Sequence, residues 1–527
     1  MRRRAGIERI VSLAFVVCLF VPLLASIFQE DLEISTSEKR KLEQLPDITL
    51  DYSILQTFPE QFEGYYDDHF GFKNDMVRLH NYVLAKAFKR TQTPGIVIGS
   101  NNWLFYDGDG ATADYIGLTS YREATLERFK YVLQDRKRWL DSLGTHYLFL
   151  PIPNKINVYD DQLPSRIRRY SGVTKYDQII GYLQGTEGFK NFIDAQTILR
   201  EGKKSFPTFL QTDSHWNHDG VYLVYREVMD RLQPWLPGLT PLQQSANKTW
   251  IEGFSGDLAI MMNLKGLITE TAPQINIERS CRLIPPTPMF SLKKIKEYRN
   301  LPTYRLPEVS GCDKGRYTAV FIHDSFGDFL RPYFSQHFKK IIYVHYLNFE
   351  DAKGIIERER PDVVIDQRAA RNLQRALEPD PELEQRFVSD RFDVLASPLT
   401  ELNGRQLNEA IVYRYKVSTS VRADEAVVNF AEAKSTVSLL MPLNRPPEGI
   451  AALKLIADSL QEMDVQICYA ASGSNQEDEF QCGMRTLMPG ENTLFFRIFE
   501  PQPSGVLSIV AERGGTVALK GIAVKAE

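Results

Sequence analysis

The amino-acid sequence predicts an α/β domain with a mostly parallel sheet, preceded by a membrane anchor and followed by a C-terminal β-sandwich. From about residue 90 to 370, apolar runs alternate with amphipathic helical segments, which is typical of a parallel sheet covered by helices. Beyond about residue 420, short strand-like runs are separated by Gly, Pro and Asn turns, as in a sandwich. At 527 residues the chain is too long for one ordinary core, so we expect two folded domains.

The N-terminal 30 residues predict a retained signal anchor. Four arginines (Arg2, Arg3, Arg4, Arg9) precede an uncharged run from Ile10 to Phe28, and acidic residues follow it. Nineteen residues at helical rise span roughly 28 Å, about one hydrocarbon core. The arginines should keep the N-terminus in the cytoplasm and place the rest of the chain outside it. A cleavable signal peptide is the alternative, but no good small-x-small site follows the run.

The α/β domain is expected over residues 35–415, after a helical lead-in at 31–90. A hairpin is predicted at 95–108, where two apolar runs flank a Ser-Asn-Asn turn. The further elements expected are strands at 145–153, 192–195, 317–325, 340–346 and 361–367 and helices at 121–143, 174–184 and 220–232.

The sandwich is expected over residues 420–527, with 399–417 as the join. Its strands are predicted at 435–443, 452–460, 464–472, 492–499, 505–512 and 516–526. This region has no tryptophan, and its aromatic residues lie mostly within strand patterns where burial is the natural role: Phe430, Tyr469, Phe480, Phe495, Phe496 and Phe499. Sugar-binding platforms rely on exposed rings, so we expect weak or polar polymer binding, or docking to partner proteins.

Composition and cysteines narrow the class of protein. A formal net charge of -4 gives no sign of a basic nucleic-acid footprint. Cys18 lies in the apolar run, and the other four cysteines allow three pairings. Pairing Cys281 with Cys312 and Cys468 with Cys482 would keep each disulfide within one predicted domain, in keeping with export. Four reduced thiols are the alternative, and no spacing suggests zinc.

Ser325 is the candidate nucleophile. The apolar strand that ends in Asp324-Ser325 places this serine at the carboxyl edge of the sheet, where α/β proteins have their sites. A helix is expected to start near Phe326, and free N–H groups at its N-terminus would stabilise an oxyanion. The alternative is that Asp324 or Ser325 only caps the helix.

Asp213 and His215 are the candidate orienting carboxylate and base. In an extended segment their side chains point to the same side, roughly 6.6 Å apart, so a modest bend would join them. His218 is expected at the surface or as a helix cap. A metal site built from Asp213, His215, His218 and Asp219 is an alternative, but it lacks an i, i+4 ligand pair and leaves Ser325 without a task.

Four motifs, in this order, resemble the alginate O-acetyltransferase family (AlgX/AlgJ-like): "GSNNWLFYDGDG", "PIPNKINVYDDQLP", "TDSHWNHDG" and "FIHDSFG". The resemblance covers about residues 35–415. It implies an SGNH-hydrolase-like fold, a location in the bacterial periplasm, and a catalytic triad of Asp213, His215 and Ser325. One departure is His323, where a glycine is commoner before Asp-Ser. The C-terminal region resembles, only generically, the carbohydrate-binding modules of some members.

The resemblance implies transfer of an acetyl group through Ser325 to hydroxyls of an exported polysaccharide. The Ser325 N–H and Asn154 are candidates for the oxyanion hole, and Lys155 should border the site; both residues could instead serve loop structure. Trp216 and Tyr106 would stack on a sugar, with core burial as the alternative. A multi-span membrane acyltransferase is the implied acetyl donor, and no cofactor, metal or nucleic acid is expected. An acetylesterase and a catalytically silent polysaccharide-binding scaffold remain alternative functions.

Overall fold

The computed structural model describes most of residues 52–527 and scattered residues before them. The described ranges are 12–13, 15–17, 20–21, 24–25, 34–35, 40–46, 52–185, 189–244, 248–275, 277, 281–288, 306–345, 349–374, 377–423, 425–443, 449–471, 481–499, 501 and 504–527. Much of the predicted anchor, including both ends of the run from Ile10 to Phe28, lies outside them. Among the described residues, no helix combines the length and apolar character needed to span a bilayer.

A six-stranded sheet forms the centre of the α/β domain, in the order β5-β12-β10-β11-β9-β8. Four strands run parallel, and the two at the β8 edge are antiparallel. Their bounds are β5 His146–Ile152, β8 Leu283–Pro288, β9 Glu308–Cys312, β10 Thr318–His323, β11 Lys340–His345 and β12 Val363–Ala369. The mostly parallel α/β sheet expected from the sequence is therefore confirmed. The expected strand at 192–195 forms only one isolated bridge, between Phe149 and Phe192.

Helices cover both faces of this sheet, so its central strands are apolar on both sides. On one face α9 (Ala195–Lys203) and α10 (His218–Leu232) pack against residues such as Phe321 and Ile365. On the other, α5 (Glu123–Ser142), α8 (Lys175–Gly185) and α14 (Phe349–Glu359) pack against residues such as Val320 and Val364. The parallel strands thus end together at one edge, where their polar residues meet.

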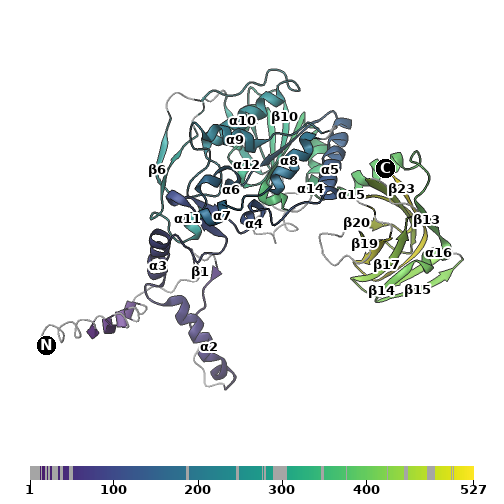
Figure 1. The fold of residues 1–527 in the computed structure, drawn as a ribbon, viewed down its shortest axis with the longest axis horizontal. Coiled ribbons are helices and arrows are strands. Elements are labelled where there is room, and N and C mark those ends of the chain that lie inside the picture. The colour runs from purple at the N-terminus through teal and green to yellow at the C-terminus, as the bar shows by residue number, and fades with distance from the viewer. Residues whose placement is uncertain are drawn as a thin grey trace.

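Smaller elements surround this core. The helical lead-in comprises α2 (Tyr52–His69), which Figure 1 shows extending away from the domain, and α3 (Lys73–Phe88), which packs beside α11. The predicted hairpin is present as β3 (Ile96–Ile98) and β4 (Leu104–Tyr106). The remaining elements of the domain are α4 (Ala111–Tyr115), α6 (Lys155–Val158), α7 (Ser165–Arg168), β6 (Trp250–Phe254), α11 (Asp257–Met261), β7 (Glu270–Pro273), α12 (Ser325–Asp328), α13 (Arg331–Phe334) and α15 (Pro381–Phe392).

Two antiparallel sheets form the C-terminal sandwich, which confirms a β-rich C-terminal region. One has the order β15-β16-β23-β18-β21, with β13 also paired to β23, and the other the order β14-β17-β22-β19-β20. The elements are β13 Thr400–Asn403, α16 Gly404–Glu409, β14 Ile411–Tyr415, β15 Val417–Arg422, β16 Glu425–Phe430, β17 Ser435–Pro442, β18 Ile450–Ser459, β19 Met463–Ala471, β20 Gln481–Leu487, β21 Gly490–Phe499, β22 Ser504–Ala511 and β23 Gly515–Ala526.

The sandwich begins earlier than the expected residue 420. The stretch 399–417, predicted as a join, contributes β13, α16 and β14 to it. The short helix interrupts the strand pattern, which hid these two strands in the sequence. Three of the aromatic residues expected in the core are buried there (Phe430, Tyr469, Phe496). Phe495 and Phe499 are buried instead against the α/β domain, beside α15 and α5, and Phe480 lies outside the described residues.

Each domain contains one disulfide. Cys281 is bonded to Cys312 beside the paired strands β8 and β9. Cys468 is bonded to Cys482, and these two residues are direct cross-strand neighbours on β19 and β20. Both bonds join the cysteines that are closest in sequence, so neither disulfide links the two domains.

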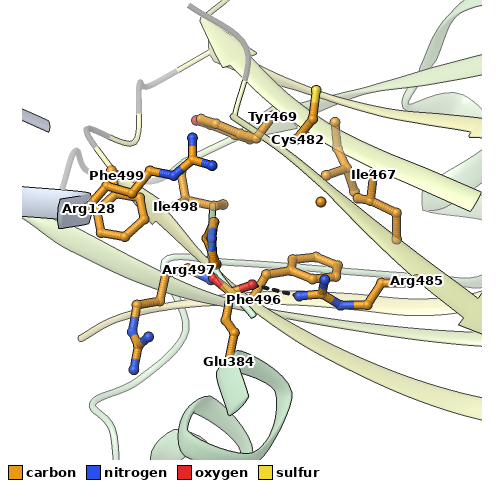
Figure 2. A pocket seen from close by; sticks show the side chains of 13 residues that line it. Arg128, Glu384, Ile467, Tyr469, Cys482, Arg485, Phe496, Arg497, Ile498 and Phe499 are labelled. Carbon is orange, nitrogen blue, oxygen red and sulfur yellow. Dashed lines mark hydrogen bonds and ion pairs between the residues drawn. The ribbon is translucent and has the colours of Figure 1, made fainter. Parts of the chain in front are cut away.

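Buried ion pairs fasten the sandwich to the α/β domain. Arg497 on β21 bonds to Asp135 on α5 and, at 3.1 Å, to Glu527, with only 2% of its side chain exposed. Arg485 on β20 bonds to Glu384 on α15 at 2.6 Å. Figure 2 shows Arg485 pointing toward Glu384 beside a pocket lined by both domains, and Figure 1 shows the sandwich lying next to α5 and α15. The domain junction therefore rests on charges withdrawn from water.

We predict that Asp135→Ala destabilises the protein by about 3 kcal/mol, because the Arg497 guanidinium stays buried after it loses this partner. Thermal unfolding and limited proteolysis of the junction near residue 395 would measure the loss. The matched control is Asp141→Ala on the same helix, whose half-exposed ion pair with Lys137 contributes at most about 0.5 kcal/mol. Equal effects of the two substitutions would contradict a stabilising role for the junction.

Candidate active site

Ser325 is held at the sheet edge by the carboxylate of its neighbour Asp324. This carboxylate accepts hydrogen bonds from the Phe326 N–H (3.0 Å), Gln367 Nε2 (3.0 Å), the Ala369 N–H (2.6 Å) and Asn372 Nδ2 (2.7 Å). Asp324 is thus the cap of α12 and also ties the turn to the end of β12. The capping alternative raised by the sequence is correct for Asp324, and it leaves the Ser325 hydroxyl available.

His215 lies between Ser325 and Asp213, although these segments are far apart in the sequence. His215 Nε2 is 2.9 Å from Ser325 Oγ, and His215 Nδ1 is 2.7 Å from Asp213 Oδ1. Both His215 and Ser325 are partly exposed, so a substrate can reach them. The distances are those that a nucleophile, a base and an orienting carboxylate require. The three predicted residues therefore come together in one site.

The electrostatics favour an ionised Asp213. Burial alone would raise the pKa of this carboxyl. The hydrogen bond and charge interaction with His215 lower it, and so do the hydrogen bonds from the backbone N–H groups of Asp257 and His215, so that the pKa is about 2. The ionised carboxylate accepts a hydrogen bond from the N–H at His215 Nδ1. Nε2 is then the unprotonated nitrogen that accepts the hydrogen bond from the Ser325 hydroxyl.

Asp257 and Ser214 belong to the site and were missed in the sequence. Asp257 Oδ1 accepts from the Ser214 N–H and Oδ2 from the Ser214 hydroxyl, both at 2.6 Å, and Oδ2 lies 3.6 Å from His215 Nδ1. Burial, and then the charge of Asp213, raise the pKa of Asp257. A Cβ on the preceding Gly256 would lie 2.4 Å from the Asp213 Cβ, so a glycine is required there. The sequence feature that could have indicated Asp257 is the Ser-Gly-Asp at 255–257, which leads into an apolar helix.

Lys155 anchors the loop that carries Asp213. Its buried Nζ donates to the carbonyls of Leu210 (3.0 Å), Gln211 (3.2 Å) and Asp213 (2.6 Å). Burial lowers the pKa of Lys155 to about 8, against the charge of Asp213, which raises it. Of the two predicted roles, substrate contact or loop structure, the three carbonyl partners favour loop structure.

Asn154 is a buried amide that no described residue satisfies. Neither its Oδ1 nor its Nδ2 has a hydrogen-bond partner in the described part of the chain. It follows β5, whose last residue Ile152 pairs with Ala369, and the Ala369 N–H bonds to Asp324. These contacts put Asn154 at the same strand ends as Ser325. A buried amide without partners is costly unless water or a ligand supplies them, which suits an oxyanion donor.

The aromatic candidates divide. Trp216 is fully buried and its Nε1 donates to the Phe326 carbonyl at 3.1 Å, so it braces the nucleophile turn, and the idea of a sugar platform there is wrong. Tyr106 is partly exposed, and the Arg371 guanidinium lies over its ring at 4.9 Å and over Phe326 at 5.1 Å. Tyr106 therefore remains a candidate for substrate contact.

The remaining polar residues of the segment have other tasks. Asn217 caps α10 by accepting from the Gly220 N–H at 2.9 Å, so the capping role considered for His218 is wrong. The Asp219 carboxylate pairs with Lys248 at 2.6 Å. Among the described residues, the carboxylates that lie close to His215 are those of Asp213 and Asp257. The metal site considered above, which needed His218 and Asp219, therefore does not form.

Residues 96–284 match the family model described as "SGNH hydrolase-like domain, acetyltransferase AlgX". The match confirms the resemblance to AlgX/AlgJ-like acetyltransferases over this range. It includes Asp213 and His215 and ends before Ser325. No curated protein matches the sequence.

Three solved structures are among those to which parts of this chain are similar. The O-acetyltransferase domain of Pseudomonas putida AlgJ is 16% identical with a TM-score of 0.36, covering 55% of this chain and 95% of that one. Pseudomonas aeruginosa AlgX is 11% identical with a TM-score of 0.37, covering 85% and 99%. A carbohydrate binding module of Cellvibrio mixtus lichenase 5A, in complex with cellotriose, is 14% identical with a TM-score of 0.20, covering 25% and 99%. These scores lie below 0.5 and carry no weight for function.

We predict that activity falls as the pH rises through about 8, because Lys155 then loses one of the three N–H donors that hold the Asp213 loop. The folded-state pKa is below the ordinary value of about 10.4, so the unfolded chain binds more protons between these values and this group makes folding stability rise with pH. Hydrolysis of an activated acetyl ester should therefore decline while the melting temperature does not.

Lys155→Met tests the assignment. It should lower kcat at neutral pH by roughly 100-fold through displacement of the Asp213 loop, and abolish the alkaline decline near pH 8. Lys137→Met, which removes a partly exposed lysine on α5, is the control and should retain the wild-type profile. A decline near pH 8 that persists in Lys155→Met would assign the titration to another group.

Proposed function

We propose that this protein is an O-acetyltransferase that moves acetyl groups through an acetyl-serine on Ser325 to hydroxyl groups of an exported polysaccharide. The observation that carries the proposal is the unbroken hydrogen-bonded chain Asp213–His215–Ser325 at the edge of the sheet. The match of residues 96–284 to an acetyltransferase family model supports transfer over other uses of the same triad.

The reaction has two balanced halves. In the first, Ser325 Oγ attacks the acetyl carbonyl carbon, His215 Nε2 takes the hydroxyl proton, and the bond to the donor's leaving group breaks as that group receives the proton. In the second, a sugar hydroxyl gives its proton to His215 and attacks the acetyl-serine. Ser325 regains the proton as the ester bond to it breaks. Asp213 stabilises the imidazolium in both halves.

Stabilisation of the tetrahedral oxyanion falls to the Ser325 N–H and to Asn154. The Ser325 N–H lies in the first turn of α12, and no helical partner is available to it at that position. The Asn154 amide brings a buried donor without a described partner. Two such donors, placed before the reaction begins, stabilise the developing charge without reorganisation.

Water as acceptor would make the same site an acetylesterase, and a loss of reactivity would make it a polysaccharide-binding scaffold. The complete triad speaks against a silent scaffold. The choice between sugar and water depends on how well the acceptor site excludes water, which only the acceptor experiment below measures.

The proposed compartment is the periplasm, with the chain held at the inner membrane by its N-terminal apolar run and supplied with acetyl groups by a multi-span membrane acyltransferase. The arginines before Ile10 and the two disulfides support an oxidising compartment outside the cytoplasm. The sandwich, whose described core aromatics are buried, is proposed to bind the polymer weakly or to dock partners.

We predict that Ser325→Ala lowers acetyl transfer by at least about 1,000-fold, because the nucleophile is lost while the fold is kept. The purified chain is incubated with an activated acetyl ester and an oligosaccharide, and acetylated sugar, free acetate and acetyl-peptide are measured by mass spectrometry. The acetyl group should appear on the peptide that contains Ser325. Ser171→Ala, at an exposed serine, is the control and should match wild type.

Three outcomes would count against the proposal. Acetate release that sugar does not divert would make the protein an esterase. Absence of both acetyl-peptide and product with intact folding would favour the scaffold. Full activity in Ser325→Ala would remove the triad from the mechanism.

We also predict that the chain partitions with the inner membrane and resists alkaline extraction, because the run from Ile10 to Phe28 is long enough to span it. Fractionation followed by N-terminal sequencing measures this. A mature N-terminus beyond residue 28 would refute the anchor, whereas a cytoplasmic location would refute the compartment as well.

A further inference from the structure

A second cluster of polar side chains lies directly beside the nucleophile turn. His323 ends β10 and His345 ends β11, and the two residues are cross-strand partners in the parallel sheet. The centroids of their rings are 4.9 Å apart. Both rings lie on the face of the sheet that carries the cross-strand pair Phe321 and Tyr343, two residues earlier on each strand. Asp328, at the end of α12, completes the cluster.

The tautomer of His323 is fixed by its backbone. Its Nδ1 lies 2.8 Å from the Asp324 carbonyl, which can only accept, so Nδ1 carries the proton and Nε2 presents a lone pair. The residue is 1% exposed, and Nε2 has no hydrogen-bond partner among the described residues. A buried acceptor without a partner costs about 1–3 kcal/mol.

The bond to the Asp324 carbonyl accounts for Nδ1 of His323, but among the described residues nothing accounts for Nε2. The ring stacks on Phe321 at 4.7 Å between centroids and lies edge-on to Tyr343, so an apolar side chain would fill the same space without an unsatisfied nitrogen. A Cβ at Gly327 would lie 2.4 Å from the His323 Cβ, so this glycine leaves room for a side chain at position 323. His323 is also the position at which this sequence departs from the motif of the family that it resembles.

The other two members of the cluster supply complementary ligand atoms. His345 Nε2 lies 3.3 Å from Asp328 Oδ2, while Asp328 Oδ1 lies 3.4 Å from Arg331 Nη1. Glu308 also pairs with Arg331 and offsets its charge. One ligand atom from each of His323, His345 and Asp328 lies within 4.8 Å of the others. Tetrahedral zinc ligands at 2.0–2.1 Å are about 3.4 Å apart, so a contraction of at most about 1.4 Å would close the site.

We propose that His323, His345 and Asp328 bind a divalent transition-metal ion of the zinc class. Two imidazoles and a carboxylate are ligands that zinc accepts, and a ligating histidine whose second nitrogen donates to a backbone carbonyl is the arrangement found around bound zinc. This departs from the sequence expectation of no metal. The ion would tie both sides of Ser325 to β11, since His323 precedes the serine by two residues and Asp328 follows it by three.

The test uses the full chain in detergent without a histidine tag, first freed of metal by a chelator and then titrated with zinc against a chromophoric competitor. One ion per chain should bind and raise the melting temperature by about 5 °C at a hundredfold excess over Kd. His323→Gln and His345→Gln should each weaken binding at least about 10-fold. His215→Gln should not, which separates this cluster from Asp213, His215 and Asp257.

X-ray absorption of the zinc-loaded wild type decides the case even if a variant fails to fold, since this cluster supplies two imidazoles and the triad cluster one. Two imidazole ligands and no sulfur support the proposal. Absence of binding at micromolar zinc, one imidazole ligand, or binding lost in His215→Gln and kept in a folded His323→Gln would each overturn it.

Discussion

Three hydrogen bonds to the carboxylate of Asp324 join the end of β10 to the end of β12, a fourth caps α12, and the geometry of the whole site follows from them. They fix the direction in which the chain leaves the sheet, and hence the position of the Ser325 hydroxyl. Gln367 contributes twice, because its amide also accepts from the Asp324 N–H. A nucleophile that must stay within hydrogen-bond reach of a base on another segment needs such a rigid support.

The base and its carboxylate arrive on a loop, and a loop needs a different support. Lys155 supplies it by donating from one ammonium group to three carbonyls of the loop. Gly256 allows the chain before α11 to press against Asp213, and Asp257 then holds Ser214. The loop is thereby fixed at several atoms on either side of His215, which explains how a segment without regular structure holds a catalytic distance.

The sequence predicted those features that depend on local pattern. Apolar runs and helical periodicity located β5, β10, β11 and β12 and the helices α5, α8 and α10, and the strand-to-helix junction drew attention to Ser325. Asp257 and the carbonyl partners of Lys155 could not be found this way, because they are set by contacts across more than 40 residues. Likewise β13 was missed, because its partner β23 lies more than 100 residues further on.

The pairing of β13 with β23 has a consequence for how such proteins can be rebuilt by recombination. The first and last described strands of the sandwich are neighbours, so the two ends of the domain lie side by side. A module of this kind can in principle be exchanged for another as a unit. The exchange would carry Arg485 and Arg497 away from Glu384 and Asp135, and a substitute module must bring cations of its own to the same two carboxylates or leave them buried and unpaired. Glu384 on α15 and Asp135 on α5 therefore limit which domains can replace the sandwich.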